Sequence, residues 1–184
     1  MVTARLVAAI GRWRAEQPGV LVVAVDGHGG AGKTTIATAT AAAIGASVVH
    51  TDDFFTPALP GASLADYYDW RRIRAEALQP LRAGLAARFD RFDWAAGHGL
   101  DGRVDVEPAE LILLEGVFAA APQLADLVDR TVLVQTPAPE RLRRLHARIP
   151  ADEWDEAWLA AEREYFGHVR PPSSFCLLAS GGSS

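Results

Sequence analysis

The chain has 184 residues, of which 49% are hydrophobic and 22% charged, so it is long enough for one well-packed domain and too short for two ordinary ones. A formal net charge of −5 gives no general basic surface, which argues against tight sequence-independent binding to DNA or RNA. The single cysteine, Cys176, excludes an internal disulfide framework and is typical of a reducing cytoplasm. The first residues contain no apolar run of about 18 residues and no signal-peptide pattern, so we expect a cytoplasmic protein without a membrane partner.

The first part of the sequence predicts a helix, a strand, a glycine-rich loop and a second helix, in that order. Residues 1–19 carry arginines among apolar positions and read as an amphipathic helix with Thr3 as its N-cap. The apolar, β-branched run 20–25 is typical of a strand buried in a parallel sheet. The glycine-rich loop 27–34 follows it, and the alanine-rich segment after the loop predicts a helix that ends at Gly45.

The rest of the sequence continues the alternation of strands and helices around one less regular stretch. Residues 63–82 have a helical pattern that Pro80 is expected to interrupt, and residues 88–108 predict a hairpin or an irregular excursion. Apolar strands that alternate with helices predict one α/β domain over residues 1–184, with a mostly parallel central sheet flanked by helices and a flexible tail at about 180–184. We expect the further strands at 46–50, 111–116, 130–136 and 175–178, and the further helices around 122–128, 139–148 and 151–168.

The glycine-rich loop matches the pattern G-x-x-x-x-G-K-[ST] at every required position, between a predicted strand and a predicted helix. Backbone N–H groups of such a loop point inward and bind phosphate oxygens, while Lys33 reaches the outer phosphates and Thr34 can bind Mg²⁺. Lys33 is the only lysine among 18 basic residues, and it stands where a compact charge fits between phosphates better than a guanidinium does. The alternative is a glycine-rich turn that arose by chance. The predicted nucleotide-binding residues are Gly27, Gly29, Gly30, Ala31, Gly32, Lys33, Thr34 and Thr35.

Acidic residues follow two of the predicted strands, at the edge of the sheet where a ligand crevice is expected. Glu115 ends one strand and is a candidate to hold Mg²⁺ together with Thr34; its alternative role is to cap the next turn. Asp52 follows another strand and could take the proton of an attacking hydroxyl or serve as a further Mg²⁺ ligand. Asp53 could support Asp52 by hydrogen bonding at the acceptor site. For both aspartates the alternative is a turn or N-cap role.

Four segments together resemble the uridine kinase and phosphoribulokinase branch of the P-loop kinases, from about Val20 to Gly181. They are VAVDGHGGAGKTT in the loop, HTDDFF after the second predicted strand, LILLEGVFA later in the chain, and RLRRLHAR as an arginine-bearing lid at about 139–152. The resemblance implies a three-layer P-loop NTPase fold with ATP and Mg²⁺ as cofactors. It also implies phosphate transfer to a primary hydroxyl, with Asp52 as the catalytic base.

The resemblance further implies that Arg144 and Arg148 close over the phosphates during transfer, so that Arg148 joins Lys33 and Asp52 in catalysis. Arginine side chains can stabilise the charge that spreads over phosphoryl oxygens. From their spacing alone, Arg141, Arg144 and Arg148 share one helix face, which is also typical of a solvated or salt-bridged surface. Both a lid and an ordinary surface are therefore open for these residues.

For the acceptor pocket, the resemblance points to the excursion at about 57–106. One candidate wall lies at 68–72, and the segment 92–98, which includes Trp94, resembles the one that holds the base in uridine kinases. A carboxylate suits sugar hydroxyls, and aromatic faces suit a planar ring. The alternative is that the aromatic side chains belong to the core and the histidine to a surface loop. The predicted acceptor-site residues are Asp52, Asp53, Tyr68, Asp69, Arg72, Phe92, Asp93 and His98.

These motifs predict a small ATP-dependent kinase that phosphorylates a hydroxyl of a small, nucleoside-like acceptor such as uridine or cytidine. A kinase of another small alcohol, such as pantothenate, a sugar phosphate or a specialised metabolite, is the alternative within enzymes. From another class, the chain could be a non-catalytic nucleotide-binding switch. A GTPase that reads guanine through Asn-Lys-x-Asp is excluded, because the only lysine lies in the glycine-rich loop. The oligomeric state stays open, a homo-oligomer included.

Overall fold

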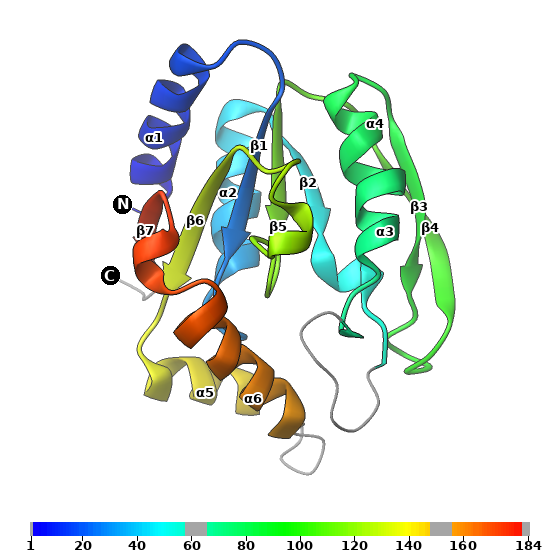
Figure 1. The fold of residues 1–184 in the computed structure, drawn as a ribbon, viewed down its shortest axis with the longest axis vertical. Helices are drawn as coiled ribbons and strands as arrows, with labels where there is room; N and C mark the ends of the chain where they lie inside the picture. Colours follow the sequence, from blue (N-terminus) through cyan, green and yellow to red (C-terminus); the bar gives the residue numbers. More distant parts are fainter. Residues whose placement is uncertain (1, 58–65, 148–155, 182–184) are drawn as a thin grey trace.

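A parallel sheet forms the centre of the protein in a computed structural model, which describes residues 2–57, 66–147 and 156–181. Five strands within these ranges pair in the order β2-β5-β1-β6-β7, and every pair is parallel (Figure 1). All residues of β1 and β5 are buried, as their continuous apolar runs predicted for strands that are covered on both faces. The strands are β1 (Leu21–Asp26), β2 (Ser47–His50), β5 (Leu111–Glu115), β6 (Arg130–Gln135) and β7 (Leu177–Ser180).

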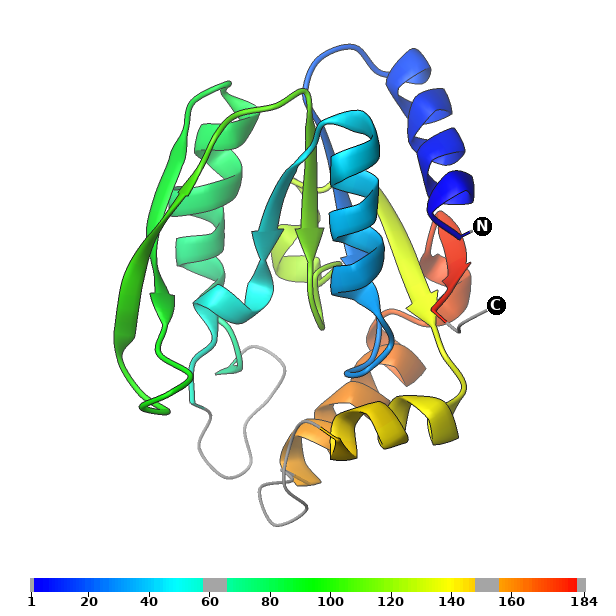
Figure 2. The same ribbon diagram turned by 180° about the vertical axis from the view of Figure 1, so that it is seen from behind.

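Helices cover both faces of the sheet, which confirms the three-layer α/β fold. α1 and α2 pack on one face, and Figure 2 shows α2 in front of the strands. α3 and α4 pack on the other face together with the segment that follows β5. Within the described ranges, no helix has both the length and the apolar character needed to cross a membrane. The helices are α1 (Val2–Glu16), α2 (Lys33–Ile44), α3 (Trp70–Arg72), α4 (Gln79–Arg82), α5 (Ala138–His146) and α6 (Glu156–Glu164).

Short helical turns of other types complete the elements. A π-helical turn joins α3 to α4, and a second one extends α6. They lie at Ile73–Leu78 and Tyr165–Val169, and 3₁₀ turns lie at Thr51–Phe54, Pro122–Leu124 and Pro172–Ser174.

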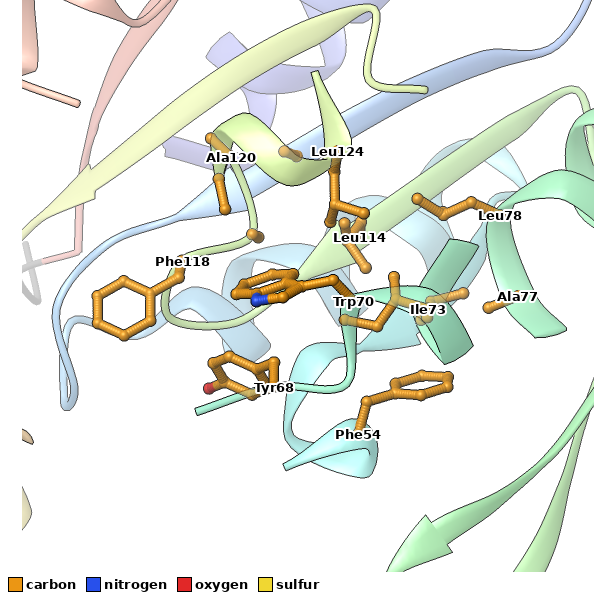
Figure 3. Close-up of a cluster of buried hydrophobic side chains, with 14 of the residues drawn as sticks. Phe54, Tyr68, Trp70, Ile73, Ala77, Leu78, Leu114, Phe118, Ala120 and Leu124 are labelled. Atoms are coloured by element: carbon orange, nitrogen blue, oxygen red, sulfur yellow. The ribbon is translucent and has the colours of Figure 1, made fainter. Parts of the chain in front are cut away.

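Alternate residues of the buried strands contribute to two hydrophobic clusters, one on each face of the sheet. Val22 of β1 belongs to the cluster under α3 and α4, and Val23 belongs to the cluster under α1 and α2. In the first cluster, the side chains of Trp70 and Ile73 lie between Leu114 of β5 and the ring of Phe54 (Figure 3). The aromatic residues that follow β2 are thereby anchored on the sheet.

Residues 87–106 form an antiparallel hairpin outside the sheet, one of the two predictions made for this stretch. Its strands are β3 (Ala87–Phe92) and β4 (Leu100–Val106). Phe89 of β3 packs on Phe54, with ring centroids 4.6 Å apart. The turn of the hairpin points toward the same end of the molecule as the carboxyl ends of the strands (Figure 1).

Several boundaries differ from the sequence predictions. The first helix begins at Val2, so Thr3 lies inside it and is not its N-cap. The helix expected around 122–128 is a short 3₁₀ turn, and the last strand lies two residues later than expected, where it pairs with β6. Of the helix expected at 151–168, residues 151–155 lie outside the described part of the chain.

The helix expected at 63–82 begins at Trp70 and runs through Pro80 to Arg82 without an interruption. In a regular α-helix a proline ring clashes with the carbonyl four residues earlier. Just before Pro80 the chain bonds in the wider π pattern, because the N–H of Gln79 donates to the carbonyl of Arg74. The wider turn accommodates the proline ring.

The buried carboxylate of Asp26, at the end of β1, joins the start of the glycine-rich loop to the segment after β5 and to the π-helical turn that extends α6. It accepts hydrogen bonds from the backbone N–H groups of Gly27 at 2.7 Å, Phe118 at 2.9 Å and Ala120 at 2.9 Å. The hydroxyl of Tyr165 donates to it at 2.6 Å. Burial raises the pKa of Asp26, although these hydrogen bonds oppose the shift. The ionised form of Asp26 is therefore stabilised by these hydrogen-bond donors.

We expect Tyr165→Phe to lower the free energy of unfolding by about 1–3 kcal/mol, because it removes a hydrogen bond to a buried carboxylate and keeps the ring packing. Chemical denaturation of the variant and the wild-type chain measures the difference. A loss below about 0.5 kcal/mol, as for an ordinary surface substitution, would contradict the structural role given to this bond.

Candidate functional site

A cavity of about 480 Å³ lies at the carboxyl ends of the central strands, between the glycine-rich loop, the hairpin turn, α5 and α6. This is the edge of the sheet where the sequence placed the ligand crevice. Polar lining residues come from the glycine-rich loop, the start of α2 and the ends of β2 and β5, and they include Gly29, Gly30, Lys33, Thr34, Asp52 and Glu115. The apolar and aromatic lining residues are Phe55, Tyr68, Trp94, Leu145, Trp158 and Leu159.

The glycine-rich loop adopts the tight turns that its sequence pattern predicted. Gly30 and Gly32 have φ values of 75° and 92°, in the left-handed region that glycine enters without strain. A Cβ at Gly30 would lie 2.6 Å from the backbone oxygen of Arg141, so a larger residue would push α5 away. Lys33 begins α2, is 8% exposed, and donates from Nζ to the backbone oxygen of His28 at 3.0 Å. Its charge is thus held at the loop, beside the positive end of the α2 dipole.

The predicted nucleotide-binding residues divide into two groups. Gly27 and Ala31 do not line the cavity. The N–H of Gly27 donates to Asp26 at 2.7 Å, and the carbonyl of Ala31 accepts from Thr136 at 2.9 Å. These two residues shape the loop. The residues that line the cavity are Gly29, Gly30, Gly32, Lys33, Thr34 and Thr35.

Thr34 and Glu115 meet in the polar part of the cavity. Thr34 Oγ1 donates to Glu115 Oε1 at 3.0 Å, and His50 Nδ1 lies 2.5 Å from the same oxygen. The hydrogen bond to Glu115 raises the pKa of His50. Mg²⁺ takes hydroxyl and carboxylate ligands together with phosphate oxygens and water, so this pair fits it beside a nucleotide. Within the described ranges, no group of three or more His, Cys, Asp and Glu side chains is arranged to hold a metal.

Asp52 lies just after β2 and lines the cavity. Tyr68 donates its hydroxyl to Asp52 Oδ1 at 3.1 Å, and Trp94 donates Nε1 to the backbone oxygen of Asp52 at 3.3 Å. The carboxylate is reached by solvent through the cavity, while protein encloses its other sides. This enclosure raises the pKa of Asp52; Lys33 opposes the shift and Glu115 adds to it. A carboxylate that is open to the cavity and has a raised pKa is suited to accept a proton.

The raised pKa of Asp52 predicts a pH dependence of stability. A carboxyl group with a raised pKa in the folded state stabilises the fold most when it is protonated, and this contribution is lost as pH rises through the raised pKa. We therefore expect Asp52→Asn to raise the free energy of unfolding at neutral pH. The gain shrinks as pH falls toward 3.8, the ordinary pKa of the group. Denaturation at a series of pH values measures it, and a variant less stable than wild type at neutral pH would contradict it.

Glu162 of α6 is a buried carboxylate that lies against the glycine-rich loop. It is 2% exposed, its Oε1 accepts from the N–H of Gly29 at 2.8 Å, and its Oε2 lies 2.8 Å from His28 Nδ1. Arg141 Nη1 is 3.6 Å from Oε2. Burial raises the pKa of Glu162, but the hydrogen bonds from His28 and Gly29 outweigh it, so the net shift is downward. Glu162 is therefore ionised at neutral pH.

α5 places two of the predicted arginines on the backbone of the loop. Arg141 Nη1 donates to the carbonyl of Gly29 at 3.4 Å, and Arg144 Nη1 donates to the carbonyl of Gly30 at 3.3 Å. Neither arginine lines the cavity. Arg148 lies outside the described residues, as does the adjoining end of the predicted lid. Contact of Arg144 and Arg148 with phosphates therefore stays a prediction.

The predicted acceptor residues after β2 have different positions. Asp52 and Tyr68 line the cavity. Asp53 is half-buried beside Asp52 but does not line it, and burial raises the pKa of Asp53. Asp69 caps α3 by accepting from the N–H of Arg72 at 3.0 Å, and Arg72 donates to a backbone oxygen of β3 at 2.6 Å. Asp69 and Arg72 thus join the helix to the hairpin.

The hairpin turn brings one aromatic residue to the cavity. Trp94 lines it, with its ring centroid 4.8 Å from that of Phe55. Phe92 is 4% exposed and packs against Trp94 at 4.9 Å. Asp93 stays in the turn, where Oδ1 accepts from two backbone N–H groups at 2.9 Å. His98 is exposed and does not line the cavity.

Sequence reasoning missed the residues that α5 and α6 bring to the cavity. Trp158 and Glu162 are four positions apart and share one face of α6. A lone acid on the apolar face of a helix is a sign of a buried partner, and this was the available signal. The missed residues of these helices are Leu145, Trp158, Leu159 and Glu162; Phe55, Gly116 and Val117 also line the cavity without having been predicted as site residues.

The sequence is similar to that of curated uridine kinases. It is 30% identical over 97 residues to the uridine kinases of Staphylococcus aureus strains JH9 and Newman. The match covers 52% of this chain and 46% of each relative, so the chain spans about half the length of the curated relatives it matches. No family model matches the chain.

Several solved structures share the fold. A possible uridine kinase from Bacillus stearothermophilus has a TM-score of 0.72 and 19% identity, with 96% of both chains covered. A candidate fructose transport system kinase from Silicibacter sp. TM1040 has a TM-score of 0.70 and 21% identity, with 97% of this chain and 98% of that chain covered. D-glycerate 3-kinase from Cryptococcus neoformans has a TM-score of 0.54 and 15% identity, over 95% and 85% of the two chains. The chain thus resembles the uridine kinase and phosphoribulokinase-like P-loop kinases, as its motifs predicted.

Proposed function

We propose that the chain is an ATP- and Mg²⁺-dependent kinase that transfers the γ-phosphoryl group to a hydroxyl of a nucleoside-like acceptor such as uridine or cytidine. One observation carries the proposal: Lys33, the Thr34–Glu115 pair and Asp52 meet an aromatic wall in a single cavity. A phosphate cradle, metal ligands, a base and an acceptor pocket are the parts that phosphoryl transfer needs. The proposal includes a cytoplasmic location, because a kinase needs the ATP of the cytoplasm and because the free thiol of Cys176 suits a reducing compartment.

In this proposal Asp52 takes the proton of the acceptor hydroxyl. The acceptor oxygen forms a bond to the γ-phosphorus as the bond from that phosphorus to the β–γ bridging oxygen breaks, and ADP leaves. Tyr68 orients the Asp52 carboxylate through its hydroxyl, 3.1 Å away. Lys33 and the start of α2 balance the charge of the outer phosphates.

Thr34 and Glu115 are the residues that would hold Mg²⁺. Their oxygens are 3.0 Å apart, and the carboxylate is fixed by its contact with His50. When bound with ATP, Mg²⁺ supplies further neutralisation of phosphate charge and helps to orient the transferred group.

The identity of the acceptor rests on the aromatic side of the cavity. Trp94, Phe55 and Trp158 support an acceptor with a planar group, because aromatic rings stack on planar rings. The alternative is a kinase of another small alcohol, such as pantothenate, a sugar phosphate or a specialised metabolite. The positions of Asp93 and His98 favour this alternative, since neither residue lines the cavity as expected for contacts to a base.

Release of ADP from ATP and Mg²⁺ in the presence of different acceptors tests the proposal. The panel contains uridine, cytidine, pantothenate, sugar phosphates and simple alcohols, with a no-acceptor reaction and Lys33→Ala as controls. Stimulation by uridine or cytidine is the expected result. If only another alcohol stimulates ADP release, that alcohol takes the place of the nucleoside as the proposed acceptor. Binding of ATP without stimulation by any acceptor would favour a non-catalytic nucleotide binder.

A further inference from the structure

Glu162 connects the glycine-rich loop to the aromatic lining of the cavity through one carboxylate oxygen. Its Oε1 accepts from the backbone N–H of Gly29 at 2.8 Å and from the indole Nε1 of Trp158 at 3.0 Å. Both residues line the cavity, Gly29 as part of the glycine-rich loop and Trp158 as one of the aromatic residues. Hydrogen bonds weaken steeply as their distance and angle depart from the normal range. A shift of either donor therefore changes the bond that the other donor makes.

The second oxygen of Glu162 contacts the glycine-rich loop and α5. His28 Nδ1 lies 2.8 Å from Oε2, and Arg141 Nη1 lies 3.6 Å from it. The carboxylate is 2% exposed, so bulk water cannot readily replace a lost partner, and an unpaired buried charge is unfavourable. The carboxylate is thus expected to follow the loop when the loop moves.

Trp158 extends this connection to the acceptor side. Its ring centroid lies 6.2 Å from that of Phe55 and 6.3 Å from that of Tyr68. Tyr68 in turn donates its hydroxyl to Asp52, the proposed base. The indole is therefore part of the wall that surrounds the proposed acceptor site.

We propose that Glu162 is a positioning residue that couples nucleotide binding at the glycine-rich loop to the aromatic wall of the acceptor side. The inference rests on the proposed function in one respect, that the loop binds a nucleotide. Loop amides next to Gly29 can bind phosphate oxygens, and in this proposal that binding shifts the segment. The shared oxygen of Glu162 carries this change to Trp158. The aromatic wall therefore takes the position in which it binds the acceptor when the nucleotide is present.

Binding of ADP and Mg²⁺ tests the inference with two readouts. Calorimetry measures binding, and tryptophan fluorescence at saturating ADP measures the response of the wall independently of affinity. We expect ADP to change the fluorescence of the wild-type chain and Trp158→Phe to lose most of that change. Glu162→Ala also loses most of it. Glu162→Gln keeps most of it, because its amide oxygen can accept both bonds.

Glu164→Gln is the matched control. Glu164 lies on the same helix, its side chain is 67% exposed, and it pairs with His168 on the surface. We expect this variant to show the wild-type fluorescence response. A loss of the response in this control would overturn the assignment of the coupling to Glu162.

The outcomes separate the inference from the proposed function. A full response in Glu162→Ala or in Trp158→Phe would overturn the inference alone, and so would a Glu162→Gln variant that behaves like Glu162→Ala. ADP that binds the wild-type chain without a fluorescence change would also overturn only the inference. If the wild-type chain does not bind ADP at all, both the proposed function and the inference are contradicted. If Glu162→Ala does not fold, Trp158→Phe and Glu162→Gln decide the question.

Discussion

Asp52→Asn is expected to lower the rate of phosphoryl transfer by roughly 10²–10⁴-fold, the usual contribution of a positioned general base. The amide has nearly the shape of the carboxylate, so the contact with Tyr68, 3.1 Å in the wild-type chain, can still form. It cannot take a proton from the acceptor at neutral pH. ATP binding should persist or become tighter, since the substitution removes a negative charge near the phosphates. The variant should therefore be stable and able to bind ATP, but nearly inactive.

Turnover with the acceptor that gives the greatest ADP release, together with calorimetric ATP binding, separates chemistry from binding. Asp101→Asn is the matched control, because Asp101 is an exposed aspartate of the hairpin strand β4. The control should keep wild-type turnover. Turnover of Asp52→Asn within about threefold of wild type would show that the acceptor proton leaves by another route, and the assignment of the base would be wrong.

Lys33→Ala is expected to weaken ATP binding and to lower turnover by roughly 10²–10³-fold, as the loss of one charge-stabilising donor usually does. Lys33 is 8% exposed, and its Nζ is held at the loop by the carbonyl of His28. We expect Lys33→Arg to fail to restore activity. The guanidinium is larger and planar, and the enclosed position fits a compact ammonium group.

Calorimetric ATP titration and turnover measure both effects of the Lys33 substitutions. Arg12→Ala is a control for the loss of a positive charge, because Arg12 is exposed on α1, away from the cavity. Wild-type ATP affinity in Lys33→Ala would contradict the phosphate-binding role of the loop. Full activity of Lys33→Arg would contradict only the requirement for a compact charge.

The sequence predicted those parts of the fold in which local pattern and long-range packing favour the same structure. The apolar runs of β1 and β5 suit only buried positions, and both strands are fully buried. α2 ends at Gly45 as predicted, where φ is 69° and the N–H donates to the carbonyl of Ala41. The glycine-rich loop was predictable for the same reason, because its turns require glycine and its motif has fixed spacing.

The acceptor side could not be assigned from sequence, because it depends on the geometry of a turn. The register of the hairpin shifts between Asp90 and Phe92, and this irregularity affects which side chains face the cavity. Trp94 reaches the cavity while Phe92 packs behind it. Asp93 is used within the turn. Motif similarity alone does not contain this information.

The contribution of α6 was missed because it depends on a contact between distant parts of the sequence. Glu162 and Gly29 are 133 positions apart, and no local pattern indicates which helix will lie on the loop. Trp158 and Glu162 look like an ordinary aromatic residue and an ordinary acid until the helix is placed. Their position beside the glycine-rich loop follows from tertiary packing alone.

Direct detection of the phosphorylated product tests the proposed kinase activity most directly. The chain is incubated with ATP, Mg²⁺ and each acceptor of the panel, and phosphorus NMR with mass spectrometry identifies the products. We predict a phosphomonoester of the acceptor in equal amount to the ADP released, with uridine or cytidine among the acceptors, and no product with Lys33→Ala. Release of ADP and inorganic phosphate without any phosphorylated acceptor would contradict the assignment of the chain as a kinase.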